Sequence, residues 1–319
     1  MRKTSRSCSV NPTTGLAIRV LGLALLLLPS SARAMAEDSE SGKTFNAPAA
    51  VIYFEVRGSG TATPLVVVNG GPGFAHTYLH CSGAWDLLAK HRTVVFYDQR
   101  GNGRSGALKP GQSCTLADQI ADLDALRSHL GFQRIDVLGH SWGGYLGMAY
   151  AARHPDRIEH LIICDSAAPK WQDTIFLFKD IFPEAVERQD AQNFSQALGD
   201  AEAGRASIRE YLSMLFLSME KRDAFLAKAD SYTINREVNQ ILNQDLQKFD
   251  LNPELPKFKF RTLVVTGRYD INVAPAVAYR IHRAIPHSRF AVFERSGHLP
   301  FYEEPDAFVS LVEEFLSQN

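Results

Sequence analysis

The sequence predicts an α/β fold, in which a mainly parallel sheet is flanked by helices. Three observations support this prediction: short apolar runs rich in β-branched and aromatic residues, helix-like segments between them, and one long helical block. The apolar runs are continuous rather than alternating, which is typical of strands covered on both faces. The predicted strands are Val51–Val56, Leu65–Val68, Thr93–Tyr97, Ile135–Leu138, Leu161–Cys164, Leu263–Thr266 and Phe290–Phe293.

The long helical block covers residues 166–257 and contains no convincing strand. A block of roughly 90 residues is far longer than the usual connection between a strand and a helix, which has about 2–6 residues. We therefore expect an inserted helical cap at 166–257 between two parts of one core, 45–165 and 258–319. The helices predicted within it include Phe176–Ile181, Ser207–Met219, Lys221–Ala229 and Val238–Lys248.

Residues 1–36 have the three-part pattern of a secretory signal peptide. Basic residues open the chain, an uninterrupted apolar run follows at Val20–Leu28, and small residues stand at Ala34 and Ala36, after either of which cleavage is expected. The alternative is a membrane anchor, but a spanning helix needs roughly 20 apolar residues and Arg19 shortens this stretch. The sequence predicts export to the periplasm or beyond the cell, without stable membrane insertion.

The charge pattern predicts no nucleic-acid partner. Removal of residues 1–36 takes away five basic residues and no acidic ones, which changes the formal net charge from −1 to −6. A mildly acidic surface without a block of Lys and Arg offers no electrostatic footprint for nucleic acid or an anionic membrane. The sequence leaves the oligomeric state open.

Three cysteines remain after the predicted cleavage: Cys81, Cys114 and Cys164. An odd number in an oxidising compartment leaves at least one thiol unpaired. Cys81 and Cys114 lie in loop-like surroundings, and whether they pair stays open because sequence does not give connectivity. Cys164 lies in an apolar run and is expected to be a buried, unreactive thiol.

The strongest functional signal is the segment Gly139-His140-Ser141-Trp142-Gly143-Gly144, between a predicted strand and a helix-like segment. This is the G-x-S-x-G pattern in its strand–turn–helix context, which places a nucleophilic serine on a tight, strained turn. Side chains larger than glycine two residues to either side would clash there. The turn also puts the amide of Trp142 at a helix N-terminus, where it favours an oxyanion.

Chain order selects the partners of Ser141 from ten histidines and many acids. The motif predicts the order Ser, Asp or Glu, His, with each residue after a strand. Asp270 follows Leu263–Thr266 and His298 follows Phe290–Phe293, so we expect His298 to be the base and Asp270 the acid that orients it. Asp165 is the alternative acid, but it leads into the predicted cap.

Two glycine-containing loops follow the predicted strands Leu65–Val68 and Thr93–Tyr97. In the first, Asn69-Gly70-Gly71-Pro72-Gly73, we expect the amide of Gly71 to complete the oxyanion hole with that of Trp142. The second loop, Asp98–Ser105, carries charges that we expect to form buried ion pairs holding the loop. The chain has no H-E-x-x-H, C-x-x-C pair or phosphate-binding loop motif, so no metal and no cofactor are predicted.

These segments resemble the proline iminopeptidase branch of the α/β-hydrolases. The resemblance rests on Gly70-Gly71-Pro72-Gly73, Asp98-Gln99-Arg100-Gly101, the Ser141 segment, Gly267-Arg268-Tyr269-Asp270 and Ser296-Gly297-His298, and it covers about 51–166 and 260–315. It implies an α/β-hydrolase fold with a helical cap that binds the free amine of a peptide whose N-terminal residue is removed. One departure is Asn69, where the family usually has His.

An aminopeptidase needs a carboxylate for the substrate ammonium, because a charge-assisted contact of this kind is worth roughly 1.5–3 kcal/mol. Glu184, Glu187 and Glu237 lie in the predicted cap, and Glu184 and Glu237 are the candidates for this contact. Aromatic residues of the cap would suit a small apolar side chain or form the core of the cap. They are Phe176, Phe178, Phe182, Tyr211 and Phe216.

The predicted function is an exported serine aminopeptidase that releases N-terminal proline or small residues from peptides. The alternative is a carboxylesterase or lactonase that uses the same three residues. Hydrolases of epoxides and haloalkanes are disfavoured because they need a carboxylate nucleophile, and this motif carries Ser141. A receptor without catalytic activity on the same fold is a third possibility.

Overall fold

The computed structural model describes residues 42–232 and 234–318. The predicted signal peptide, residues 1–36, lies outside the described residues. Among the residues that are described, no helix combines the length and the apolarity needed to cross a membrane.

The described residues form one eight-stranded sheet with the strand order β1-β2-β4-β3-β5-β6-β7-β8. The pairs β1–β2 and β2–β4 are antiparallel, and all other pairs are parallel. The strands are β1 Lys43–Ala47, β2 Ala50–Arg57, β3 Leu65–Val68, β4 Val94–Asp98, β5 Ile135–His140, β6 Ile158–Cys164, β7 Arg261–Gly267 and β8 Arg289–Phe293.

Both faces of the sheet are buried, and this explains the continuous apolar runs. Along β3, Val66 and Val68 belong to one apolar cluster, whereas Leu65 and Val67 belong to a second cluster on the opposite face. Successive side chains of a strand point to opposite faces, so each residue of such a run is needed to fill a core. The α/β prediction is confirmed. The strand β1 was not predicted, because only Phe45 and Ala47 of its five residues are buried.

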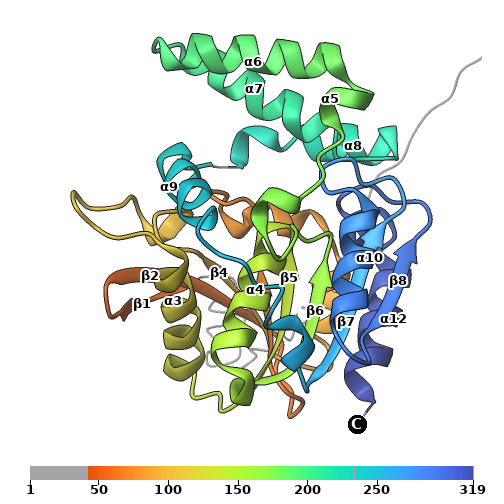
Figure 1. Ribbon diagram of the computed structural model, residues 1–319. Coiled ribbons are helices and arrows are strands. Elements are labelled where there is room, and N and C mark those ends of the chain that lie inside the picture. Colours follow the sequence, from red (N-terminus) through yellow and green to blue (C-terminus); the bar gives the residue numbers. More distant parts are fainter. Residues whose placement is uncertain (1–41, 233, 319) are drawn as a thin grey trace, which may run out of the picture. The chain divides into compact units, whose positions relative to one another are not determined.

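Helices cover both faces of the sheet (Figure 1). The first apolar cluster takes residues from α3, α4 and α10, and the second takes residues from α2 and α12. The α-helices outside the block between β6 and β7 are α2 Ala84–Leu88, α3 Leu116–His129, α4 Trp142–Arg153, α10 Pro275–Ala284, α11 Pro300–Glu303 and α12 Pro305–Ser317. Short 3-10 helices are η1 His76–Cys81, η2 Gly103–Ser105, η3 Pro155–Arg157, η4 Trp171–Asp173, η5 Ala229–Ser231 and η6 Leu255–Lys257.

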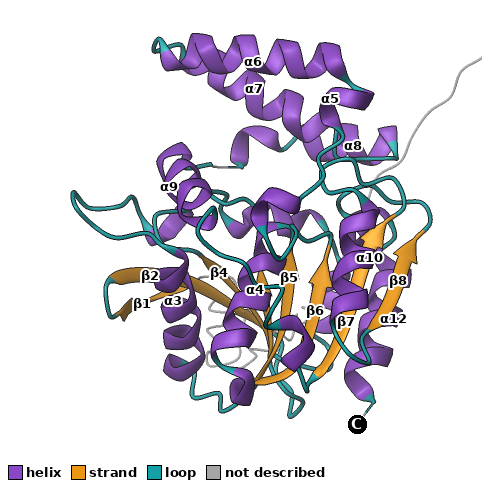
Figure 2. Cartoon of the chain, viewed as in Figure 1, coloured by secondary structure: helices purple, strands orange, loops and turns teal. Residues whose placement is uncertain are grey.

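The chain between β6 and β7 is helical and lies on the side where the parallel strands have their carboxyl ends (Figure 2). Its α-helices are α5 Phe178–Ile181, α6 Pro183–Ala197, α7 Ala201–Ser213, α8 Met219–Leu226 and α9 Arg236–Leu246. The helix α6 was not among the predicted helices. Its residues are mostly exposed and only Ala185 is fully buried, so its sequence carries little apolar periodicity.

The loop after β4 is held by buried charges, as expected. Two nitrogens of Arg100, Nε and Nη2, each donate to the carboxylate of Asp122 at 2.7 Å. A bidentate pair of this kind fixes both position and orientation of the guanidinium. The three cysteines of the described part of the chain are free, so Cys81 and Cys114 are not paired in this structure, and Cys164 is fully buried.

Candidate active site

Ser141 occupies the turn between β5 and α4 and has the backbone angles φ 58° and ψ −121°. A positive φ is rare for a residue with a side chain, and it costs of order 1–3 kcal/mol unless the surroundings enforce it. The N–H of Ser141 donates to the carbonyl of Cys164 at 2.9 Å, which ties the turn to the end of β6. The strained turn therefore presents Ser141 at the carboxyl end of the sheet.

Glycines surround this turn because there is no room for a Cβ atom. A Cβ added to Gly139 would lie 2.1 Å from the carbonyl oxygen of Gly143, and one added to Gly143 would lie 2.1 Å from the carbonyl oxygen of Val68. Both collisions are with backbone, so no side chain can move to relieve them. The spacing of the motif is thus set by the packing of α4 against β3 and β5.

The structure brings Asp270 and His298 together from the loops after β7 and β8. Nδ1 of His298 lies 2.7 Å from Oδ2 of Asp270, and both residues are buried. The other carboxylate oxygen of Asp270 accepts the N–H groups of Asn272 and Val273 at 2.8 and 2.9 Å. These donors hold Asp270 so that it orients the imidazole ring.

Nε2 of His298 is bonded to Asn272 in this structure. The side-chain nitrogen of Asn272 lies 2.8 Å from Nε2 and donates to it, which makes the ring neutral with its proton on Nδ1. Ser141 and His298 line the same small cavity. Sequence reasoning missed Asn272, because an asparagine two residues after an acid carries no signal of this contact.

Asp165, the alternative acid, lies beside Asp270 rather than on the histidine. Its Oδ1 accepts the N–H of Gly267 at 2.8 Å, and its carboxylate, that of Asp270 and the ring of His298 have polar atoms within 4.8 Å of one another. Burial, aided by the charge of Asp270, raises the pKa of Asp165 well above its usual value. Burial therefore favours the protonated, neutral form of Asp165.

Burial also sets the protonation of the other two groups. It lowers the pKa of His298 to about 4, so the ring is neutral and able to accept a proton at pH 7. It raises the pKa of Asp270, while hydrogen bonds from Val273, Asp165 and Asn272 oppose this rise. A neutral histidine held by a hydrogen-bonded acid is the resting state that a general base requires.

The loop after β3 places two backbone amides near Ser141. The N–H of Gly70 is already used, since it donates to the hydroxyl of Tyr78 at 2.6 Å. Gly71 follows with a φ of 138° and lines both cavities that Ser141 lines. Trp142 is the first residue of α4, so its N–H has no partner within the helix. The amides of Gly71 and Trp142 therefore remain the candidates for binding an oxyanion.

Asn69 occupies the position where proline iminopeptidase-like sequences usually have His, and its side chain holds this loop in place. Its side-chain amide donates to the carbonyls of Gly70 and Phe74 at 3.0 and 2.8 Å. The amide nitrogen of Gln99 donates to the carbonyl of Asn69, and the indole N–H of Trp142 donates to Oε1 of Gln99 at 2.8 Å. This buried network joins the glycine loop after β3 to the start of α4.

His140, next to the nucleophile, lines the small cavity with Ser141 and belongs to a second hydrogen-bond network. Its Nδ1 lies 2.7 Å from the hydroxyl of Tyr78, and its Nε2 lies 2.8 Å from the carbonyl oxygen of His298. Because Tyr78 accepts from Gly70, it donates to Nδ1, and Nε2 of His140 then carries the proton. His140 therefore links the glycine loop to the loop of His298.

The loop of His298 is also tied to the helical block. The N–H of His298 donates to the carbonyl of Leu215 at 2.8 Å. The carboxylate of Glu303 accepts the N–H of Gly297 at 2.6 Å and the N–H groups of Leu217 and Ser218 at 2.9 and 2.8 Å. One buried carboxylate thus holds both the loop of His298 and the segment that follows α7.

A cavity of about 370 Å³ opens between Ser141 and the helical block. The aromatic side chains of Phe74, Phe176, Phe178, Trp171 and Tyr211 line it. Its polar lining consists of amides and hydroxyls, together with Arg236. The residues in question are Gln189, Asn193, Ser207, Asn239, Asn243 and Asn272. Among the described residues that line the cavity there is no Asp or Glu.

Glu184 and Glu237, the residues expected to bind a substrate amine, do not line this cavity. Both are exposed, Glu184 in the first turn of α6 and Glu237 in the first turn of α9, and so is Glu187. Acidic residues are favoured in the first turn of a helix by the helix dipole. Of the aromatic residues named for the cap, Phe182 is exposed and Phe216 packs on Phe225 with ring centroids 5.0 Å apart.

Two clusters within the described residues have three side chains of metal-binding type. One is Asp165, Asp270 and His298 of the candidate active site, where His298 is bonded to Asp270 and Asp165 accepts from Gly267. The other is Glu55 of β2 with His76 and His80 of η1.

The fold, the serine on its strained turn and the histidine held by an acid define a hydrolase of the α/β class. The chain belongs to the α/β hydrolase fold family, whose sequence pattern matches residues 63–305. Similar relatives include the proline iminopeptidase of Saccharolobus solfataricus, which is 29% identical over 285 residues. The match covers 84% of this chain and 89% of that protein.

Two solved structures are also similar. The proline iminopeptidase of Mycobacterium smegmatis has a TM-score of 0.66 and 25% identity, and the match covers 86% of this chain and 97% of that one. The enol-lactonase of Burkholderia xenovorans has a TM-score of 0.68 and 26% identity, with 86% and 100% covered. The resemblance to proline iminopeptidases noted from the sequence is confirmed.

Proposed function

We propose that this chain is a serine aminopeptidase that releases an N-terminal proline or small residue from short peptides. The observation that carries the proposal is the similarity to a proline iminopeptidase over 84% of the chain, with Ser141, Asp270 and His298 in the order that the motif requires. The cavity beside Ser141, about 370 Å³ in volume, suits one residue and the peptide bond that follows it.

In the proposed reaction Ser141 attacks the carbonyl of the first residue. Nε2 of His298 takes the proton of Ser141, after the amide of Asn272 has released this atom. The amides of Gly71 and Trp142 stabilise the oxyanion, and Asp270 stabilises the imidazolium. His298 then protonates the leaving amine, and water hydrolyses the acyl-enzyme by the same steps.

The helical block supplies the remaining contacts. Phe178 and Tyr211 give the cavity an apolar side that accommodates a pyrrolidine ring or a small side chain. The carboxamide oxygens of Asn239 and Asn243 are acceptors for a substrate ammonium within the described lining, whereas the oxygen of Asn193 already accepts from Ser207 and Arg236. These oxygens replace the carboxylate contact for which Glu184 and Glu237 were considered.

A carboxylesterase or lactonase is the second candidate, and a specific observation favours it. The described lining of the cavity carries Arg236 and no acid, so its charge suits a substrate with a carboxylate or an ester oxygen better than an ammonium. The similar enol-lactonase structure, at 26% identity, supports the same direction. Both candidates use Ser141, Asp270 and His298 in the same roles.

Three substrates separate the two candidates: a prolyl arylamide with a free amine, its N-blocked twin, and a short-chain aryl ester. An aminopeptidase cleaves the first and not the second, because blocking removes the ammonium. Turnover of the ester alone contradicts the aminopeptidase proposal. Ser141→Ala is the control, since it removes the nucleophile and must abolish every activity that belongs to this site.

We also propose that the chain is exported, on the basis of the signal-peptide pattern in residues 1–36. Expression of the full chain in a Gram-negative host, followed by fractionation and N-terminal sequencing, tests this. Cleavage after Ala34 or Ala36 in the periplasmic fraction is the expected result. An uncleaved chain in the cytoplasmic fraction contradicts it.

A further inference from the structure

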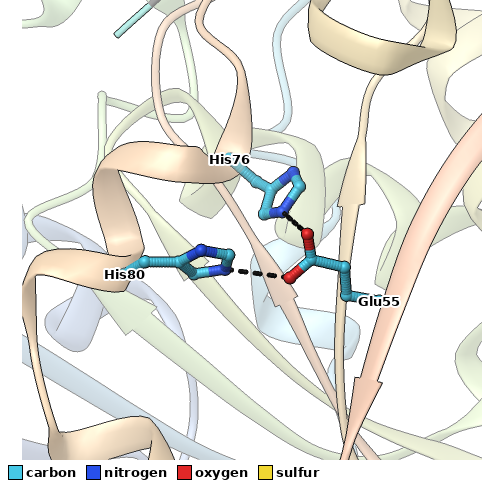
Figure 3. Close-up of side chains that lie close together, drawn as sticks. All are labelled: Glu55, His76 and His80. Atoms are coloured by element: carbon cyan, nitrogen blue, oxygen red, sulfur yellow. Dashed lines mark ion pairs between the residues drawn. The ribbon is translucent and has the colours of Figure 1, made fainter. Parts of the chain in front are cut away.

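Three side chains of metal-binding type converge beside the sheet (Figure 3). None of them lines the cavities that Ser141 lines. Glu55 comes from β2, and His76 and His80 come from η1, four residues apart on one short helix. Figure 3 shows both imidazole rings turned toward the carboxylate of Glu55. None of these residues takes part in the proposed reaction.

The spacing of the donor atoms suits a small tetrahedral ion. Nε2 of His76 lies 3.3 Å from Oε1 of Glu55, and Nε2 of His80 lies 3.2 Å from Oε2. Zinc with ligand bonds of about 2.0–2.1 Å holds neighbouring ligand atoms roughly 3.3 Å apart in a tetrahedron, close to the distance between Nε2 of His80 and Oε2 of Glu55. All three ligand atoms lie within 4.8 Å of one another, so small side-chain rotations are enough to share one ion.

Both imidazole nitrogens that face Glu55 are buried without a hydrogen bond. Within the described part of the chain, Nε2 of His76 and Nε2 of His80 have no partner of hydrogen-bond geometry, although both are within ion-pair distance of the carboxylate. A buried polar atom without a partner is uncommon and calls for an unseen ion or water. Two such nitrogens that face one carboxylate provide three ligand groups for a divalent cation.

His76 has the outer contact that metal-binding histidines usually have. Its Nδ1 lies 2.7 Å from Oδ1 of Asp98 and donates to it, so Nε2 is the atom that faces Glu55 and that zinc would bind in place of a proton. Asp98 is itself fixed, since it accepts the backbone N–H groups of His76 and Arg104 at 2.9 and 2.7 Å. Such a carboxylate sets the tautomer and orientation of the ligand before the metal arrives.

Glu55 has one oxygen available for an ion. The hydroxyl of Tyr53 donates to Oε1 at 3.0 Å, and Nη1 of Arg104 lies 3.4 Å from the same atom. The side chain of Arg104 is half exposed, and its guanidinium lies over the ring of Tyr53 and donates to the hydroxyl of Tyr53. Oε2 faces His80 and has only a longer contact of 4.0 Å with Nη2 of Arg57, so it is the oxygen that a metal would take. His80 and Asp98 line a wide surface pocket through which an ion has access.

We propose that Glu55, His76 and His80 bind one zinc ion, with water in the fourth position. Two imidazoles and one carboxylate are ligands that zinc prefers, and no further side chain is required. The ion would join β2 to η1. Tyr78, which lies on η1 between the two histidines, contacts Gly70 and His140, so the site would stiffen the support of the oxyanion loop rather than take part in the reaction.

Zinc binding to the untagged, chelator-treated protein tests this, with a chromophoric zinc chelator as competitor. The expected result is one zinc ion per chain, with affinity reduced at least about tenfold in His80→Gln and in Glu55→Gln. His91→Gln is the matched control, because it removes an exposed histidine outside this cluster. Far-UV circular dichroism establishes that each variant is folded.

X-ray absorption of the zinc-loaded protein identifies the ligands. A shell of nitrogen and oxygen at about 2.0–2.1 Å with an imidazole signature is expected, and zinc should raise the thermal midpoint of the wild type but not that of His80→Gln. A sulfur shell at about 2.3 Å would assign the ion to a cysteine instead. That result, absence of binding to the wild type, or equal binding by His80→Gln would overturn the proposal.

Discussion

The side-chain amide of Asn272 lies 2.8 Å from Nε2 of His298, the ring atom that has to receive the proton of Ser141. The histidine is therefore already oriented by Asp270 on one side and shielded by an amide donor on the other. A donor on the lone pair of Nε2 favours the neutral ring and opposes its protonation.

Asn272→Ala should raise the pKa of His298 toward its usual value, because the variant removes a bond that exists only to the neutral ring. The rate at which an organophosphonate inactivates Ser141, measured against pH, should then begin to fall at a higher pH than in the wild type. Asn243→Ala is the control, since Asn243 lines the same cavity without this bond. An unchanged acid limb would show that the Asn272 contact does not persist in solution.

The wild type should keep its reactivity in mild acid. Burial lowers the pKa of His298 to about 4, and protonation of His298 removes the base, so the loss occurs on lowering the pH toward that value rather than near the usual value of about 6.5. The same inactivation rate, measured from neutral pH downward, checks this. A limb centred near 6.5 would contradict the proposed burial of the ring.

Asp270→Asn and Asp165→Asn should differ widely in effect. Asp270 accepts a hydrogen bond from Nδ1–H of His298. The amide of asparagine at position 270 favours the wrong tautomer of the ring, so kcat should fall by about 10⁴. Burial favours the neutral form of Asp165, and asparagine keeps an acceptor for the N–H of Gly267, so the loss should stay below about tenfold. Similar losses of kcat in the two variants would contradict this and show that Asp270 and Asp165 orient His298 together.

Ser141→Gly should be inactive and more stable than the wild type. Glycine relieves the strain at φ 58°, and after its own entropic cost the gain should be about 1 kcal/mol in the free energy of unfolding. Ser141→Ala is equally inactive but keeps the strain, so it should show no such gain. Urea unfolding of the two variants measures the difference, and equal stabilities would mean that the turn stores no strain.

The sequence was sufficient for those parts of the site that a local pattern specifies. Gly139, Ser141 and Gly143 are fixed by one turn whose sterics leave few choices, and the apolar runs on either side mark buried strands. Asp270 and His298 follow from the order of elements, because parallel strands bring their carboxyl ends to one edge.

Contacts that depend on the direction of a side chain could not be predicted from the sequence. Glu184 and Glu237 were chosen as acids within the helical block, but the phase of α6 and α9 turns both toward solvent. Asn272 and Tyr78 carry no motif, and their contacts arise only when loops from distant parts of the chain meet. The helix α6 has too few buried residues to show a periodic pattern.

The double use of Glu303 bears on attempts to alter substrate range by exchanging the helical block with that of a relative. The carboxylate of Glu303 accepts the N–H groups of Leu217 and Ser218 from the block and that of Gly297 from the loop of His298. The block and this loop therefore cannot be transplanted independently of each other. A graft that ends before Leu215 leaves these bonds to the recipient. One that replaces 215–218 disturbs the general base even when every residue facing the substrate is well chosen.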